Sequence, residues 1–260
     1  MRAPSPALQA LEQFAVLEYG ALVASSPFLR AAGRGDRHPV LVLPGFTASD
    51  RSTAPLRAFL RNHGYWVHGW GLGRNLGPTA AIVEGIEKRL VAVHERHGVK
   101  VSLVGWSLGG IYARELARLH PEAVRQVITL GSPFRLRDGD RSSATFLAGR
   151  LARRFVPMSP DVGLPEDERA PLTVPATNIY TRTDGVVRWH VCVDSEGPAR
   201  ENIEVRGSHS GLGYNPAVLL AIADRLGQRE GEWAPFRASW HLAHLFPRPE
   251  WHRGQIPIAA

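Results

Sequence analysis

The stretch VSLVGWSLGG, residues 101–110, sets one serine between a strand-type run and a helix-type run. Gly105, Ser107 and Gly109 fit the pattern glycine–any–serine–any–glycine. A strand that turns sharply into a helix strains its turn residue, and side chains two positions to either side would clash there. The pattern predicts an exposed Ser107 hydroxyl, with the Leu108 N–H and the helix N-terminus directed at any oxygen attacked there. A glycine-rich turn whose serine only caps the helix is the alternative.

Strand-type and helix-type runs alternate outward from this turn. The strand-type runs are 40–43, 65–70, 100–105, 124–130, 176–180 and 202–205, and helix-type runs end near 62, 97, 120 and 226. Such alternation is typical of a parallel sheet covered by helices on both faces. The sequence therefore predicts an α/β fold, with a mostly parallel central sheet flanked by helices.

The 260 residues suit a single domain with three additions to its core. They are an N-terminal helical segment (1–37), a cap insertion (134–175) and an aromatic tail (228–260). The insertion is longer than an ordinary loop, which favours a cap over a pocket. Glu12 and Glu18 interrupt the apolar N-terminal run, so we expect an amphipathic helix packed on the domain rather than an export signal.

Composition narrows the function classes. The formal net charge is +7, but the arginines are spread along the chain, which argues against nucleic-acid binding. Cys192 is the only cysteine, and no apolar run is long enough to span a bilayer, so we expect a cytoplasmic protein. His241 and His244 lack neighbouring ligands, and neither a metal nor an organic cofactor is expected.

A nucleophilic serine requires a base, and the base requires an orienting acid. In a fold of this pattern both follow the serine, in the order acid and then histidine. Asp184 lies in a turn directly after the run 176–180, and His209 lies in the glycine-rich loop before the last helix. Asp184 and His209 are the predicted partners of Ser107. A plain Asp-Gly turn and a loop histidine without function are the alternatives.

An attacked carbonyl oxygen also needs a second N–H donor, from the loop after an early strand. Pro44, Gly45, Phe46 and Thr47 follow the run 40–43. The backbone N–H of Phe46 is the predicted donor, with that of Thr47 as the alternative.

Four segments together resemble the α/β-hydrolase superfamily, and within it the bacterial lipases and esterases: LPGF at 43–46, GWSLGG at 105–110, TDG at 183–185 and GSHSGLG at 207–213. The resemblance implies that Ser107 is the nucleophile, His209 the base and Asp184 the acid. It also implies that Phe46 and Leu108 form an oxyanion hole. Many members carry histidine before the glycine of the oxyanion loop, where this chain has Pro44.

The resemblance implies serine-dependent hydrolysis of carboxylic esters through an acyl-enzyme. The predicted pocket wall is apolar: Trp106, Phe134, Leu136, Leu147, Leu151, Phe155 and Leu212. Such a wall favours a small-molecule or lipid ester, and the aromatic tail leaves a transient lipid interface open. An acyltransferase, a phospholipid or lipid-anchor deacylase and a catalytically silent binding protein remain alternatives. The oligomeric state is not determined by the sequence.

Overall fold

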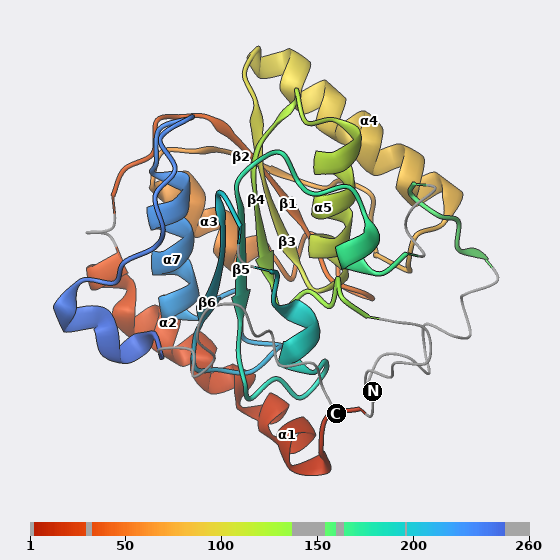
Figure 1. The fold of residues 1–260 in the computed structure, drawn as a ribbon. Helices are drawn as coiled ribbons and strands as arrows, with labels where there is room; N and C mark the ends of the chain where they lie inside the picture. Colours follow the sequence, from red (N-terminus) through yellow and green to blue (C-terminus); the bar gives the residue numbers. More distant parts are fainter. Residues whose placement is uncertain (1–2, 30–32, 137–153, 160–163, 196, 248–260) are drawn as a thin grey trace.

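A central parallel sheet organises the protein, for which a computed structural model describes residues 3–29, 33–136, 154–159, 164–195 and 197–247. The strands are β1 (Pro39–Leu43), β2 (Trp66–Gly69), β3 (Val101–Trp106), β4 (Val124–Leu130), β5 (Ala176–Tyr180) and β6 (Arg200–Glu204). Their order is β2-β1-β3-β4-β5-β6, and every neighbouring pair is parallel (Figure 1). The predicted fold class is confirmed.

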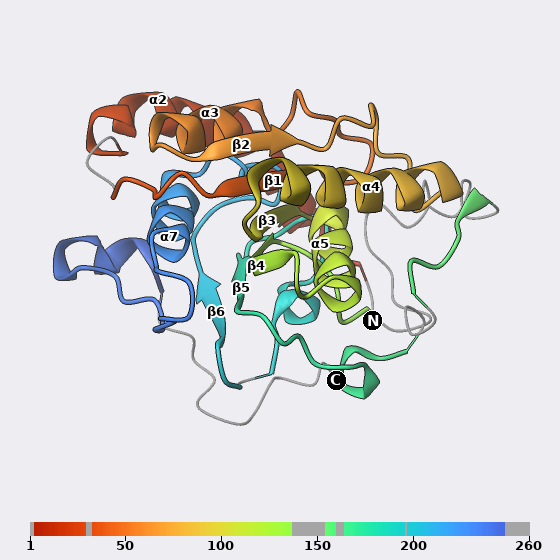
Figure 2. The ribbon, with the colours of Figure 1, turned by 90° about the horizontal axis from the view of Figure 1, so that it is seen from above.

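Helices cover both faces of the sheet. They are α3 (Ala54–Asn62), α4 (Ala80–His97), α5 (Leu108–Leu119) and α7 (Pro216–Leu226). Alternate residues of β1 point to opposite faces, so that Val40 and Val42 join the core under α3 and α7. Leu41 and Leu43 join the core under α4 and α5. Figure 2 shows these two pairs of helices on opposite sides of the twisted sheet.

Helix α4 illustrates how local sequence produces these elements. Its cap residue Thr79 accepts a hydrogen bond from the Ile82 N–H, and Gly98 ends the helix with a φ of 64°. The residues at spacings of three and four that predict an apolar stripe are buried in the structure: Ile82, Ile86, Leu90 and Val93.

The order of the strands indicates where along the carboxyl-terminal edge of the sheet a ligand site is expected. The chain crosses from β1 to β2 on one side and from β3 to β4 on the other, so the direction of winding reverses between β1 and β3. Loops at the carboxyl ends of strands flanking such a reversal form a crevice suited to ligands. Gly45 follows β1 and Ser107 follows β3, so both lie at this point.

The N-terminal segment consists of α1 (Pro6–Leu11), the 3-10 turn η1 (Glu12–Phe14) and α2 (Ala15–Leu29). It runs along the lower edge of the molecule in Figure 1, and α2 packs against α7 as expected. The expected amphipathic arrangement is wrong, because large apolar side chains lie on the outside: Val16, Leu17, Val23 and Phe28 are at least 61% exposed. Glu12 and Glu18 point inward instead, because backbone N–H groups of neighbouring loops bind them.

The remaining segments are short. The 3-10 turns are η3 (Glu166–Glu168), η4 (Trp189–Cys192) and η5 (Trp240–Leu245). In the tail, Phe236 and Phe246 pack against the core, while Trp240 is 90% exposed. Much of the predicted cap, 137–153 and 160–163, lies outside the described residues. Within the described ranges, no helix has both the length and the apolarity to cross a bilayer.

Candidate active site

Ser107 occupies a strained turn between β3 and α5. Its φ of 52° and ψ of −120° lie outside the backbone regions that residues other than glycine ordinarily adopt. A Cβ atom on Gly105 would approach the Gly109 carbonyl oxygen to 2.3 Å, and one on Gly109 would approach the Leu43 oxygen to 2.3 Å. Both glycines are therefore required for the tight packing of strand, turn and helix. The Ser107 N–H donates to the Leu130 carbonyl at 2.8 Å, which fixes the turn to β4.

The Ser107 side chain lines a cavity of about 430 Å³ at the reversal point of the sheet. The cavity is lined by residues 45–48 and 52, by Trp106, Ser107 and Val186, and by His209 and Ser210. Its volume falls in the range of small-molecule sites. Helix α5 begins at Leu108, so its unpaired N–H groups and the positive end of its dipole lie beside Ser107.

Asp184 and His209 are brought together from loops after β5 and β6. The His209 Nδ1 atom lies 2.6 Å from Asp184 Oδ2, and both side chains are buried. The other oxygen, Asp184 Oδ1, accepts the N–H groups of Val186 and Val187 at 2.8 and 2.7 Å. Among the described residues, no direct hydrogen bond joins Ser107 to His209, yet both line the same cavity. In the absence of substrate, the distance between a catalytic nucleophile and its base is often longer than a hydrogen bond.

The charge around His209 favours its protonated form. Burial alone would lower the pKa of His209, but the Asp184 carboxylate, its hydrogen bond and the more distant charge of Glu12 raise that pKa above its ordinary value. Asp184 also holds the imidazole so that Nε2 is left for another partner. The pair can therefore accept a proton and support the resulting imidazolium.

Residues 44–48 approach Ser107 from the end of β1. A Cβ atom on Gly45 would lie 3.2 Å from the Ser107 Cβ, which shows how closely this loop approaches the serine. The Thr47 N–H donates to the Asn75 carbonyl at 2.6 Å, whereas the Phe46 N–H has no acceptor among the described residues. Of the two donors that the sequence left open, only Phe46 is free to bind a ligand oxygen.

Asn75 braces this loop, a role that no sequence pattern predicted. Its side chain is fully buried, and its Nδ2 donates to the Pro44 carbonyl at 2.8 Å. Its backbone N–H donates to the Ala48 carbonyl at 2.8 Å. Tyr112 on α5 donates its hydroxyl proton to Asn75 Oδ1 at 3.2 Å, which links the loop to the helix after Ser107. Asn75 lies in a glycine-rich loop, where no spacing rule distinguishes it.

Of the predicted wall residues, Trp106 lines the cavity, and its Nε1 donates to the His209 carbonyl at 3.1 Å. Four others lie outside the cavity lining. The Phe134 ring supports the Arg114 guanidinium, Leu212 is in the core, Phe155 packs on Gly77, and Leu136 is 38% exposed. Leu147 and Leu151 lie outside the described residues.

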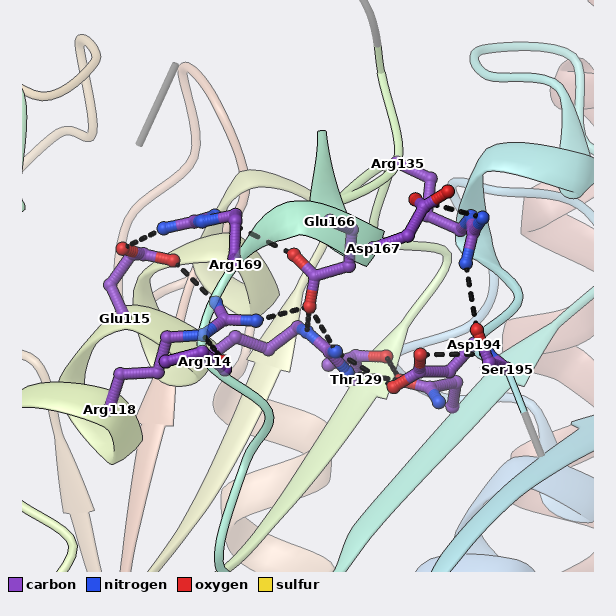
Figure 3. Close-up of polar contacts among 12 residues, drawn as sticks. Arg114, Glu115, Arg118, Thr129, Arg135, Glu166, Asp167, Arg169, Asp194 and Ser195 are labelled. Atoms are coloured by element: carbon purple, nitrogen blue, oxygen red, sulfur yellow. Dashed lines mark hydrogen bonds and ion pairs between the residues drawn. The ribbon is translucent and has the colours of Figure 1, made fainter. Parts of the chain in front are cut away.

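Buried ion pairs anchor the helix that follows Ser107 (Figure 3). Arg114 on α5 binds Glu166, and it binds Asp194 at 2.8 Å. Arg118, one turn later, binds Glu166 as well, and it binds Glu115 at 2.8 Å. Although burial opposes it, the charges of Asp194 and Glu166 raise the pKa of Arg114. These pairs fix α5 to the segments before and after β5.

A second serine–histidine–aspartate set lies at the opposite end of β3. The His38 Nε2 atom is 2.8 Å from Ser102 Oγ, and the His38 Nδ1 atom is 2.5 Å from Asp36 Oδ1. Arg125 donates to the other oxygen of Asp36 at 2.9 Å. Ser102 has no exposed surface, so no substrate can reach its hydroxyl. Among the described residues, no cluster of three or more potential ligands is suited to a metal ion.

Comparison with known proteins agrees with this architecture. The family model described as alpha/beta hydrolase fold matches residues 39–162. Together with the parallel sheet and its covering helices, this match shows that the chain has the α/β-hydrolase fold.

Individual relatives are distant. A pimeloyl-[acyl-carrier protein] methyl ester esterase of Klebsiella pneumoniae is 36% identical over 62 residues, which span 24% of this chain and 23% of that protein. Lipase B of Aspergillus fumigatus superposes with a TM-score of 0.58 at 18% identity, over 78% of this chain and 57% of that chain. A lipase-esterase related protein from Clostridium acetobutylicum gives 0.52 at 15% identity, over 74% and 97%. At these identities the solved structures establish the fold alone.

Proposed function

We propose that the protein hydrolyses carboxylic esters through an acyl-enzyme intermediate on Ser107. One observation carries the proposal: a serine in a strained turn at a helix N-terminus shares a cavity with a histidine whose Nδ1 lies 2.6 Å from a buried aspartate. This arrangement matches the requirements for nucleophile, base and orienting acid. The names of the relatives, which include a methyl ester esterase and a lipase, support an ester as substrate.

In the first half of the proposed reaction, Ser107 Oγ attacks the ester carbonyl carbon while His209 Nε2 accepts the hydroxyl proton. Asp184 stabilises the imidazolium through the Nδ1 hydrogen bond. The oxygen of the tetrahedral intermediate accepts hydrogen bonds from the N–H groups of Phe46 and Leu108. One such donor contributes about 2.7–4 kcal/mol to lowering the barrier.

In the second half, the intermediate collapses, the ester C–O bond breaks, and His209 returns the proton to the leaving alcohol. A water molecule then attacks the acyl carbon while His209 accepts one of its protons. His209 returns this proton to Ser107 Oγ as the bond between the acyl carbon and Oγ breaks, which releases the acid and restores the free serine. No step requires a group beyond these side chains and N–H donors. The chain's own residues thus supply every proton transfer.

The cavity favours a small ester with an apolar acyl or alcohol group. Phe46, Trp106 and Val186 supply apolar lining, and a volume of about 430 Å³ suits a substrate of modest size. The described lining contains no lysine, arginine or carboxylate that would select a charged group. We expect short and medium acyl chains to be preferred to long ones.

Hydrolysis of a chain-length series of p-nitrophenyl esters by the wild type and by Ser107→Ala tests the proposal. We expect turnover in the wild type that is lost in the variant, with the preferred chain length giving the reach of the cavity. Product analysis with an added alcohol separates hydrolysis from acyl transfer. A folded wild-type protein that hydrolyses none of these esters would contradict the proposal.

A further inference from the structure

Two carboxylates of the N-terminal segment reach the loops that carry Asp184 and His209. Glu12 lies in η1 and Glu18 in α2, more than 160 residues before those loops. Both side chains are partly buried against these loops, although the same segment exposes large apolar side chains. The orientation therefore reflects a specific interaction and not the general preference of charged groups for water.

Glu12 binds both loops with one carboxylate. Its Oε1 accepts the N–H of Gly185 at 2.8 Å and the N–H of His209 at 2.9 Å. Its Oε2 accepts the N–H of Ser210 at 2.8 Å. Gly185 directly follows Asp184, so a single side chain fixes the spacing between the loop of the aspartate and the loop of the histidine.

The approach of Glu12 depends on the lack of a side chain at Gly185. A Cβ atom there would come within 2.3 Å of the Leu8 carbonyl oxygen and 2.8 Å of the Glu12 Cγ. Burial alone would raise the pKa of Glu12, but hydrogen bonds from Ser210, Gly185 and His209 lower it. The carboxylate is therefore ionised at neutral pH while it holds the loops.

Glu18 holds the histidine loop from its other end. Its Oε1 accepts the Ser208 N–H at 2.7 Å and the Ser208 hydroxyl at 2.5 Å, and its Oε2 accepts Asn215 Nδ2 at 2.7 Å. Asn215 is also the cap of α7, where its Oδ1 accepts the Ala217 N–H. A Cβ atom on Gly211 would lie 2.2 Å from the Glu18 carboxyl group, so this glycine makes room for it.

We propose that Glu12 is a positioning residue, which sets the Asp184–His209 pair in register with Ser107 and adds negative charge behind the imidazole. Glu18 fixes the same loop as an auxiliary anchor. The proposal rests on the proposed ester hydrolysis, because it assigns Glu12 to the chemistry of that site. It also makes the N-terminal segment part of the active site and not an appendage of the domain.

Kinetics of Glu12→Ala and Glu12→Gln test the positioning role. We expect Glu12→Ala to lower kcat about 100-fold with little change in KM, because a small displacement of a catalytic group has an effect of that size. Glu84→Gln is the matched control, since Glu84 is an exposed glutamate on α4 that pairs with Lys88. Thermal unfolding of each variant shows whether a loss of activity reflects a loss of fold.

The pH dependence supplies a readout that a purely structural role would not move. The ionisable groups around the pair are Glu12 and Glu18 on the N-terminal segment, Asp184, and behind it Arg182, Arg188, His190 and Cys192. Hydrolysis requires neutral His209, so kcat/KM rises with pH through the pKa of that imidazole. Glu12→Gln removes a nearby negative charge, so the His209 imidazolium is less stabilised than in the wild type. We therefore expect the acidic limb of the kcat/KM profile to move to lower pH.

Direct titration of His209 by imidazole ¹H–¹⁵N spectra tests the same point without any substrate. The titration midpoint of His209 should be lower in Glu12→Gln than in the wild type and unchanged in Glu84→Gln. A wild type that hydrolyses no ester would sink the proposed function, while the titration would still test Glu12. An active wild type that shares its kcat and its His209 midpoint with folded Glu12→Gln would overturn the positioning role.

Discussion

Strand β3 has a serine–histidine–aspartate set at each of its two ends. Ser107 follows the strand and belongs with His209 and Asp184, and we call these three the Ser107 set. Ser102 lies near the start of the strand and belongs with His38 and Asp36, which form the Ser102 set. The hydrogen bonds of the Ser102 set are the more complete, since its serine is bonded to its histidine at 2.8 Å.

Both sets contain a close histidine–aspartate hydrogen bond, but the surroundings of their serines and histidines differ. Ser107 has a positive φ, adjoins a helix N-terminus and lines an open cavity, whereas Ser102 lies within a regular strand and has no exposed surface. Burial and the charge of Arg125 lower the pKa of His38 despite its bond to Asp36, while the pKa of His209 is raised. A hydrogen-bonded set of the right residue types is therefore insufficient evidence for an active site.

The largest expected difference is between the two serines. Ser107→Ala removes the attacking oxygen of the proposed mechanism, and we expect kcat to fall by about six orders of magnitude, as in a serine protease that loses its nucleophile. Ser102→Ala should leave kcat/KM near the wild-type value, because among the described residues its hydroxyl forms a hydrogen bond with His38 alone, far from the cavity. Steady-state hydrolysis of a p-nitrophenyl ester by both folded variants measures the difference. Equal losses in the two variants would remove the basis for assigning the sets different roles.

The two aspartates should differ next. Asp184→Asn leaves the shape of the site but removes the charge that supports the imidazolium, and we expect a loss in kcat of about 10⁴-fold. Asp36→Asn alters a carboxylate that is half exposed and pairs with Arg125, so activity should be retained. If Asp184→Asn retained full activity as well, another carboxylate would have to orient His209.

Asn75 braces the loop of residues 44–48, which lies beside Ser107, so its substitution should affect the Ser107 set alone. Asn75→Ala removes the hydrogen bond to the Pro44 carbonyl and the link to Tyr112, so the Phe46 N–H should lose its fixed position. We expect kcat to fall by up to about 100-fold, approaching the effect of losing one oxyanion donor. Asn62→Ala, at an exposed position at the end of α3, is the matched control. An Asn75→Ala variant with wild-type kcat would show that residues 44–48 need no brace.

For the Ser102 set the expected effect is on stability. Ser102→Ala leaves His38 Nε2 buried without its partner, which destabilises the fold by about 1–3 kcal/mol. Urea unfolding at neutral pH measures this change, with Ser25→Ala on α2 as a control whose hydroxyl donates to the Ala21 carbonyl of its own helix. A stability equal to that of the wild type would mean that the Ser102 set contributes nothing to the fold.

The smallest expected effect concerns pH and has opposite signs in the two sets. The pKa of His38 is lowered in the folded protein, so its contribution to stability is present above about 6.5 and is lost as pH falls. The pKa of His209 is raised, so its contribution is present below about 6.5 and is lost as pH rises through the folded value. Unfolding of His38→Ala and His209→Ala between pH 5 and pH 8, relative to wild type, should show these opposite slopes.

Sequence patterns predicted the parts of the molecule that depend on local chemistry. The turn around Ser107 requires small residues at fixed spacing, and the order of acid and histidine follows from the order of the strands. Asp184 and His209 are accordingly side by side in the structure.

The remaining features depend on contacts between distant segments. The Glu12 carboxylate accepts a hydrogen bond from the His209 N–H, although the two residues are nearly 200 positions apart in the sequence. Asn75 donates to the Pro44 carbonyl from a loop whose sequence has no recognisable motif. Apolar side chains such as Phe134 and Leu212 fit a pocket wall or a core equally well by sequence, and only the fold directs them away from the cavity. Thr47 could be separated from Phe46 only once its N–H was seen to bond Asn75.

Labelling with a fluorophosphonate decides between the two serines in a single experiment. Trypsin cleaves after Lys100 and Arg114, so Ser102 and Ser107 fall in one peptide whose fragmentation spectrum locates the label. We expect the phosphonyl group on Ser107, none on Ser102, and no labelling of this peptide in Ser107→Ala. A folded wild-type protein that takes no label on Ser107, or takes it on Ser102, would contradict the assignment of catalysis to the Ser107 set.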